Sequence, residues 1–431
     1  MRCALLISLL FASAANAQEP LRLSLTDAIH RALSTGTQTE LARTAEERAR
    51  IARLQGLENM LPQVDARLIR YNQSINFETF GITLPGQPAI VPPFDVTDAQ
   101  INAAMQIFNI AAVRMYRSLQ AGESASGYAT EQAQNDVAAA VARLYVIAQR
   151  AATQVSSREA DVALFERLLK VAQDEFTAGT GTRLDVSQAT VQVHRAEQAL
   201  LLAQNDQQAA TLALLNAIGV DPGTPATLTE PLAPAPPAPP VDTALVTARA
   251  NRPELKEIAA REKSASLALS AQRARRLPSV SFDFTGDYSG NHATDLFWTR
   301  RIAATLAMPI FSADIEAAIA RADADYNEAR IRADQQRRDI VQDVRRAVMS
   351  LENANARVAV ATENEKVAEE SLTVARDRRA AGYGSPVEVD RAQDAYRQAR
   401  EDLIAAQADA AAATYDMQHA TGEIRTMVVR Q

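Results

Sequence analysis

The chain repeats itself once at a constant spacing. The segment AGTGTRLDVSQA at 178–189 returns as AGYGSPVEVDRA at 381–392, which is 203 positions later. The same offset aligns the sequence without a gap from about residue 98 to residue 219. Two copies are too few for an open solenoid, which needs about three or more repeats. The duplication therefore favours a closed, pseudo-symmetric structure.

A proline-rich segment separates the two copies. Residues 221–240 read DPGTPATLTEPLAPAPPAPP, and the prolines exclude a helix and favour an extended linker. We therefore expect a first structural repeat at 18–220, a second at 241–423 and a short C-terminal tail at 424–431.

The first 17 residues are typical of a secretory signal peptide. Arg2 supplies a positive start, an apolar run follows, and Ala15-Asn16-Ala17 fits a cleavage site. Cleavage there removes Cys3, the only cysteine, so the mature protein would work outside the cytoplasm without disulfides or cysteine chemistry. No later stretch reaches about 18 apolar residues, so a membrane-spanning helix is not expected. A soluble exported protein and one that crosses a membrane as β-strands both remain open.

Each repeat contains the same four segments in the same order: a helix, a pair of strands, a very long helix and a further helix. The first repeat has them at 25–58, at 64–77 and 98–108, at 110–178 and at 184–218. The second repeat has them at 242–276, at 279–288 and 298–310, at 313–381 and at 386–421.

The periodicity of the apolar residues supports these assignments. The strand segments alternate apolar and polar residues, which is typical of strands with one apolar face. The long helices contain no proline, and apolar residues from Val137 to Phe176 follow coiled-coil spacing, with Arg158 as the one break. Glycine closes the helix ends in the turns that follow, so we expect two tight helix-to-helix turns, with the glycines at Gly179, Gly181, Gly382 and Gly384.

The four expected strands are too few for one chain to close a β-barrel by itself. Strands of about 10 residues can cross a bilayer at a tilt, but open sheet edges are unfavourable in hydrocarbon and single-chain barrels begin at about eight strands. If these strands enter a membrane, several copies of the chain must share one barrel. A small soluble sheet that caps a coiled coil is the alternative.

This arrangement resembles the outer-membrane efflux protein family, the TolC-like exit ducts of Gram-negative bacteria. The duplication, the Leu-Pro pairs before the first strand of each repeat, Pro309-Ile310-Phe311 and the two Gly-x-Gly turns carry the resemblance, which covers essentially the whole mature chain. It implies a mainly α fold with a membrane β part. Duplicated long antiparallel coiled-coil hairpins would form an α-helical barrel, and four strands per chain would contribute to a shared trimeric 12-stranded β-barrel.

The resemblance also implies partners and a function. It implies a homotrimer in outer-membrane lipid that docks on a periplasmic adaptor (a membrane fusion protein) and an inner-membrane pump of RND, ABC or MFS type. The chain would then be the passive exit duct of a tripartite efflux or type I secretion system. The alternative is a periplasmic coiled-coil adaptor, which would be expected to carry a β domain between the halves of one hairpin. An exported enzyme on a helical scaffold is a further alternative.

Acidic residues after the turns are the candidate site. In the family, carboxylates after the second turn ring the periplasmic mouth. The matching pattern places the first acid at Glu388 and the second at Arg391, with Asp390 one position early. The hypothesis is a constriction formed by Glu388, Asp390, Arg391 and the corresponding Asp185, although these acids also suit the start of any helix.

Two further sets of residues have expected roles. By resemblance, the four turn glycines lie where the adaptor would make contact. Tyr288 and Trp298 flank their strands where a membrane-interface aromatic belt would be, and a role in core packing is the alternative for each. Arg275 and Arg276 belong to an arginine-rich run that is expected either to be solvated or to meet lipid headgroups or the adaptor.

Patterns for catalysis or metal binding are missing from the sequence. The histidines are far apart and none has a second ligand at zinc-site spacing; they are His30, His194, His292 and His419. No nucleophile elbow, phosphate loop or dinucleotide fingerprint occurs. The formal charge of −7 argues against a nucleic-acid partner. We therefore expect no enzyme activity, no cofactor and no metal site.

Overall fold

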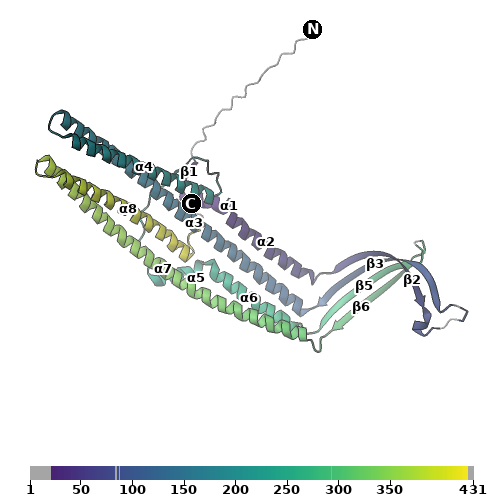
Figure 1. The fold of residues 1–431 in the computed structure, drawn as a ribbon. Coiled ribbons are helices and arrows are strands. Elements are labelled where there is room, and N and C mark those ends of the chain that lie inside the picture. The colour runs from purple at the N-terminus through teal and green to yellow at the C-terminus, as the bar shows by residue number, and fades with distance from the viewer. Residues whose placement is uncertain (1–20, 83–84, 87, 293, 426–431) are drawn as a thin grey trace, which may run out of the picture. The chain divides into compact units, whose positions relative to one another are not determined.

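The structure is a computed structural model that describes residues 21–82, 85–86, 88–292 and 294–425. The expected signal peptide lies outside these residues, as does most of the expected C-terminal tail. The elements in chain order (Figure 1) are β1 (Leu21–Leu23), α1 (Leu25–Thr35), α2 (Thr37–Glu58), β2 (Gln63–Asn76), η1 (Phe77–Phe80), β3 (Ile90–Phe108), α3 (Ile110–Thr177), α4 (Arg183–Ala217), β4 (Ala226–Leu228), α5 (Val241–Asn251), α6 (Pro253–Ala274), β5 (Ser279–Gly290), β6 (Phe297–Ala307), α7 (Ala313–Ala380) and α8 (Pro386–Thr421).

The duplication is visible in the lengths of the helices. α3 and α7 each have 68 residues, and α4 and α8 have 35 and 36. Both hairpins therefore come from the same helical pattern.

The first helix expected in each repeat is two helices in the structure. α1 and α5 have 11 residues each, and α2 and α6 have 22 each. Gly36 interrupts the first pair in an extended conformation, with φ −70° and ψ 130°. Arg252 interrupts the second pair, because Pro253 follows it and disfavours helical backbone at the preceding residue. The single helices expected at 25–58 and 242–276 were therefore wrong.

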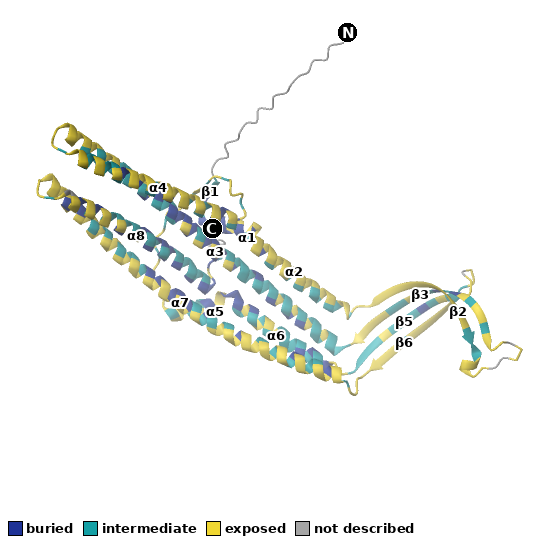
Figure 2. Cartoon of the chain, in the orientation of Figure 1, coloured by how far each residue is buried: buried dark blue, intermediate teal, exposed yellow. Residues whose placement is uncertain are grey.

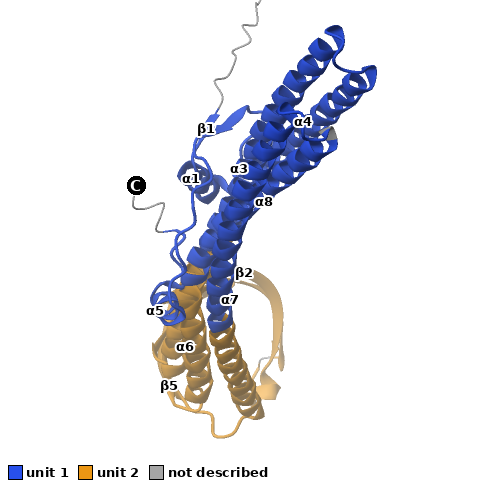
Figure 3. Ribbon diagram, turned by 90° about the vertical axis from the view of Figure 1, so that its left-hand side faces the viewer, with its two compact units in different colours: residues 1–40, 133–252, 340–431 blue, residues 41–132, 253–339 orange. Residues whose placement is uncertain are grey.

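The chain forms two compact units that cut across the two repeats (Figure 3). Unit 1 comprises residues up to Glu40, Ala133–Arg252 and residues from Ile340, and unit 2 comprises Leu41–Gln132 and Pro253–Asp339. Each unit contains parts of both repeats because equivalent elements pack side by side, so a repeat is not a separate domain.

Unit 2 contains the sheet. Among the described residues, four strands form it in the order β2-β3-β5-β6, and each neighbouring pair is antiparallel. β3 begins at Ile90, before the expected start at 98, because this early part pairs with β2 alone. Proline is tolerated where a strand lies at an edge, so Pro92 and Pro93 do not end the strand.

Unit 1 contains the largest apolar core. Buried residues of α1, α3 and α4 form it together with Leu23 of β1, as the dark ribbon in Figure 2 shows for these helices. Tyr145 is 1% exposed and its hydroxyl donates to the carbonyl of Leu23 at 3.0 Å. Burial raises the pKa of Tyr145 to about 12, so the hydroxyl stays a hydrogen-bond donor at neutral pH.

The proline-rich segment packs on unit 1. Its Ala226–Leu228 forms β4, which pairs in parallel with β1. Gln149 of α3 donates to the carbonyls of Glu230 and Pro231 at 2.8 and 3.2 Å, and Asn355 of α7 donates to that of Pro236 at 2.9 Å. The segment therefore connects the two hairpins as a strap and is more than a spacer.

Candidate functional site

The turns between α3 and α4 and between α7 and α8 are built in the same way. Gly179 and Gly382 have φ of 78° and 83°, in the left-handed region that favours glycine. A Cβ on Gly181 or Gly384 would approach backbone atoms of the preceding helix to 3.0 or 2.8 Å. The first glycine of each turn thus supplies the conformation, and the second allows the close approach.

The acids that follow the two turns differ in their bonding. Thr182 donates to the carboxylate of Asp185 through its hydroxyl at 2.7 Å and through its amide at 2.9 Å. These hydrogen bonds lower the pKa of Asp185, whose amide donates back to Thr182 at 3.2 Å. Asp185 therefore caps its own helix.

Glu388 occupies the matching position in α8 without this role. The hydroxyl of Ser385 accepts from the amide of Val387 at 3.2 Å, and no capping box forms there. Glu388, Asp390 and Arg391 are exposed, and within the described part of the chain none of the three takes part in an ion pair. Three charged side chains at the start of α8 thus remain available to solvent or to a partner.

The sheet has one apolar and one polar face, because successive residues of a strand point to opposite sides. The apolar face has rows across the four strands at Val64-Ala103-Phe284-Ile302, Ala66-Ile101-Gly286-Arg300 and Leu68-Ala99-Tyr288-Trp298. The polar face has rows at Asp65-Asn102-Thr285-Arg301 and Arg67-Gln100-Asp287-Thr299. Most residues of the apolar face are exposed within the single chain.

Tyr288 and Trp298 are directly opposite each other on β5 and β6. Their ring centroids are 5.3 Å apart and the rings are tilted by 48°. Trp298 lies over Gly286, where an added Cβ would come within 2.1 Å of the ring. The two aromatic side chains therefore form one patch near the end of the strands.

Ion pairs join α3 to α8 within unit 1, and sequence reasoning did not find them. Arg158 contacts Glu401 at 2.5 Å, and Arg143 contacts Asp416 at 2.6 Å. A hydrogen bond between Nε2 of His419 and Oδ1 of Asp136, at 2.7 Å, also joins these helices. The only sign of these contacts in the sequence was Arg158, a charged residue at a position where the coiled-coil spacing expects an apolar one.

The arginine-rich run at the end of α6 is paired with acids of α7. The pairs are Arg273 with Asp323, Arg275 with Asp314 and Arg276 with Glu316. These contacts hold the two helices together where they lead into and out of β5 and β6.

Among the described residues, no group of three or more His, Cys, Asp or Glu is placed to hold a metal ion. None of the helices in this part of the chain has both the length and the apolar character that a membrane span requires.

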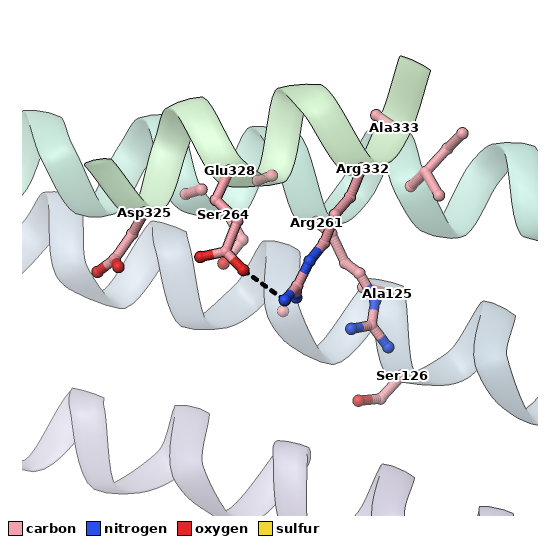
Figure 4. A pocket seen from close by; sticks show the side chains of 12 residues that line it. Ala125, Ser126, Arg261, Ser264, Asp325, Glu328, Arg332 and Ala333 are labelled. Carbon is pink, nitrogen blue, oxygen red and sulfur yellow. Dashed lines mark ion pairs between the residues drawn. The ribbon is translucent and has the colours of Figure 1, made fainter. Parts of the chain in front are cut away.

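Unit 2 contains a cavity of about 430 Å³ lined by α3, α6 and α7 (Figure 4). Its two arginines are already paired, Arg332 with Glu328 and Arg261 with Glu257. Small residues such as Ala125 and Ala333 form much of the remaining wall. The cavity therefore combines a largely apolar wall with two arginines whose charges are neutralised locally.

The duplicated hairpins and the two-faced sheet together define a channel-type fold, and comparison with known proteins identifies it. The sequence model of the outer membrane efflux protein family matches residues 45–220 and 244–423, which is most of the chain. The chain therefore belongs to this family, as its sequence resemblance predicted. No curated protein sequence matches the chain.

Solved structures of outer-membrane proteins share the fold at low sequence identity. VceC of Vibrio cholerae has 19% identity over 92% of this chain and 96% of its own, with a TM-score of 0.77. The CmeC channel of Campylobacter jejuni has 16% identity over 93% and 85%, with a TM-score of 0.79. The MtrE channel of Neisseria gonorrhoeae has 19% identity over 92% and 88%, with a TM-score of 0.73.

These findings confirm the expected fold class, mainly helical with duplicated hairpins and a sheet of four strands among the described residues. Membership in an outer-membrane efflux family also agrees with the expected role in efflux. The roles of Glu388, Asp390, Arg391, Asp185, the turn glycines, Tyr288 and Trp298 stay predictions.

Proposed function

We propose that three copies of this chain form a passive exit duct in the outer membrane, as part of a tripartite efflux or type I secretion system. The observation that carries the proposal is the sheet, which has an exposed apolar face, a polar face and two open edges at β2 and β6. Unpaired strand edges are unfavourable in lipid. Pairing β6 of one copy with β2 of the next removes the edges and directs the polar face into a shared lumen.

The helical hairpins would continue this lumen into the periplasm. The chain offers no nucleotide-binding motif, so the energy for transport must come from a partner. That partner is an inner-membrane pump of RND, ABC or MFS type, reached through a periplasmic adaptor that contacts the Gly179–Gly181 and Gly382–Gly384 turns. Export by the signal peptide at 1–17 would bring the chain to the outer membrane.

Glu388 and Asp390 would form the narrow periplasmic mouth. Repeated around a threefold axis, their exposed carboxylates would give rings of negative charge that concentrate cations and disfavour anions. Arg391, on the same turn, would reduce this selectivity. Asp185 would contribute less than Glu388, because its carboxylate already accepts the hydrogen bonds of Thr182.

Conductance of purified protein in planar bilayers tests the proposal. We expect an SDS-resistant, heat-modifiable trimer with cation-selective conductance, and reduced selectivity after Glu388→Ala with Asp390→Ala. A matched control, Glu166→Ala with Asp206→Ala, removes the same charge from exposed positions of α3 and α4 away from the turns.

Each result bears on a separate part of the proposal. Selectivity that is unchanged in the Glu388/Asp390 double variant would refute the mouth assignment alone. A monomer recovered from the periplasm without detergent would refute the duct itself and favour a periplasmic adaptor.

A further inference from the structure

The apolar face of the sheet carries an arginine between two uncharged rows. Arg300 lies on β6 in the row Ala66-Ile101-Gly286-Arg300. The rows on either side, which end at Ile302 and at Trp298, contain no charged residue. Arg300 is exposed, and its guanidinium makes no ion pair or side-chain hydrogen bond with any described residue. A permanently charged group thus lies on the face that the proposed function directs into lipid.

A charged group on a lipid-facing surface needs a polar partner, either on the protein or at the level of the lipid headgroups. Ionisable residues inside membranes are rare, and by default they mark a functional contact. The row of Arg300 is next to the row of Tyr288 and Trp298, the aromatic residues near the strand ends. An arginine there can extend its aliphatic stem along the sheet and bring its guanidinium to the headgroup level.

Trp298 limits the directions in which Arg300 can extend. The indole ring covers Gly286, the residue directly opposite Arg300 on β5. Only glycine leaves room for the ring there, since a Cβ would approach it to 2.1 Å. The β5 side of Arg300 is therefore occupied by an aromatic ring, and its other side is the edge of β6, which the proposed trimer pairs with β2 of the next copy.

A second copy of the chain does not offer a carboxylate at this face. In the proposed trimer the neighbouring edge is β2, whose only acid, Asp65, belongs to the polar face. On the apolar face, the nearest acid beyond the row of Tyr288 and Trp298 is Asp95 of β3. Its carboxylate already accepts hydrogen bonds from Arg70 and Asn72 at 2.9 Å each. In the proposed trimer, therefore, no carboxylate of a neighbouring copy is placed to pair with Arg300.

We propose that Arg300, with Trp298 beside it, binds the phosphate of an outer-leaflet lipid. A guanidinium matches phosphate oxygens with two parallel hydrogen bonds, and an indole is suited to the interface where such phosphates lie. The proposal rests on the proposed function, which places the apolar face in lipid and the ends of the strands farthest from the helices in the outer leaflet.

The chain contains a natural fluorescent reporter of this patch and a second arginine that serves as a control. Trp298 is the only tryptophan, so intrinsic fluorescence reports on this patch. Arg301, the next residue along β6, belongs to the polar face. Arg301→Gln therefore removes the same charge from the same strand without changing the apolar face.

The experiment compares wild-type trimer, Arg300→Gln, Arg300→Lys and Arg301→Gln in phosphatidylcholine nanodiscs. Each is prepared with diphosphoryl lipid A or with the same lipid after dephosphorylation, and Trp298 emission and bound lipid A are measured. We expect a saturable change with the phosphorylated lipid. Arg300→Gln should weaken it about tenfold, as expected for loss of a charged hydrogen bond, and Arg301→Gln should leave it unchanged. Arg300→Lys should retain part of it.

Several outcomes would overturn the inference. An equal response to both lipids would do so, as would wild-type affinity in Arg300→Gln. Dissociation of the Arg300→Gln trimer in every lipid would show that Arg300 joins copies of the chain instead. A failure of Arg300→Gln to fold would leave the comparison between Arg300→Lys and Arg301→Gln, and equal affinity of these two variants would refute the phosphate contact.

Quenching of Trp298 by brominated phosphatidylcholine separates this inference from the proposed function. Strong quenching without selectivity for phosphate would refute the lipid contact and leave the duct intact. Absence of quenching would show that the sheet does not face lipid, and the proposed function would then fail with it.

Discussion

Arg158 of α3 donates through Nη2 to Oε1 of Glu401 on α8, at 2.5 Å. Its other terminal nitrogen, Nη1, contacts Asp161 on the same helix at 3.3 Å. The side chains of Arg158 and Glu401 are only 18% and 30% exposed. This partly shielded pair connects the first hairpin to the second in unit 1, at the seam position where the apolar pattern is broken.

Replacing Glu401 by Gln should destabilise the protein measurably. The change leaves the partly buried Arg158 with a weaker partner, and we expect the free energy of unfolding to fall by about 1–2 kcal/mol. Urea unfolding of the detergent-solubilised protein measures this. Asp409→Asn is the matched control, because the Arg357–Asp409 pair has a similar distance of 2.9 Å but side chains that are 57% and 44% exposed. The control should lose less than about 0.5 kcal/mol, and equal losses would contradict the role of shielding.

Asp161 should give the same region a characteristic pH dependence. Burial raises the pKa of Asp161 above 3.8, although Arg158 opposes the shift. The folded state therefore binds this proton more tightly than the unfolded state does. As the pH falls from neutral towards about 4, the carboxyl gains its proton first in the folded protein, which stabilises it. Unfolding at a series of pH values should show wild type gaining stability relative to Asp161→Asn as the pH falls. A difference that does not vary with pH would contradict this.

Local chemistry made much of the fold predictable from the sequence. The glycines at 179 and 382 indicated both hairpin turns, and the structure gives each a positive φ. Period-two alternation indicated the two faces of the sheet. These signals act within a few residues, so they do not depend on how distant parts of the chain pack.

Other features depend on contacts that the sequence does not reveal. The partner of Arg158 lies in the other repeat, so a single charged seam residue could not identify it. The second strand was expected to start at 98, yet the structure begins β3 at Ile90 and continues it through Pro92 and Pro93, because only β2 pairs there. The break at Arg252 has a local cause in Pro253, which the expectation of one helix over 242–276 did not take into account.

The Thr182–Asp185 cap should control the order of the first turn of α4. Thr182→Ala removes the hydroxyl that accepts from the amide of Asp185 at 3.2 Å. We expect amide hydrogen exchange in this turn to become about fivefold faster, corresponding to about 1 kcal/mol for a lost cap. Ser385→Ala in the second turn should have a smaller effect, because no capping box forms there. Equal acceleration in both turns would contradict the difference between the caps.

The same cap should weaken in acid. The hydrogen bonds of Thr182 lower the pKa of Asp185 from 3.8, so the folded state binds this proton less tightly than the unfolded state does. The contribution of the carboxylate is fully present above the ordinary value and is lost as the pH falls through the lowered one. Exchange measured in the first turn of α4 at a series of acidic pH values should therefore show the protection of wild type approaching that of Asp185→Asn. Protection that stays above that of the variant throughout would contradict the assignment.

Two glycine-to-alanine changes should have opposite effects. Gly382 has a φ of 83°, where a side chain is unfavourable, so Gly382→Ala should destabilise the protein by about 1–2 kcal/mol. Gly122 lies inside α3, and a Cβ there would meet the hydroxyl of Ser264 at an ordinary 3.6 Å. Gly122→Ala should therefore stabilise the protein by about 0.5–1 kcal/mol, because alanine loses less backbone entropy in a helix. Thermal unfolding of the two variants under identical conditions decides between them. A stabilised Gly382→Ala would mean that the second turn adopts another conformation, and a destabilised Gly122→Ala would mean that α3 and α6 pack more closely at Ser264.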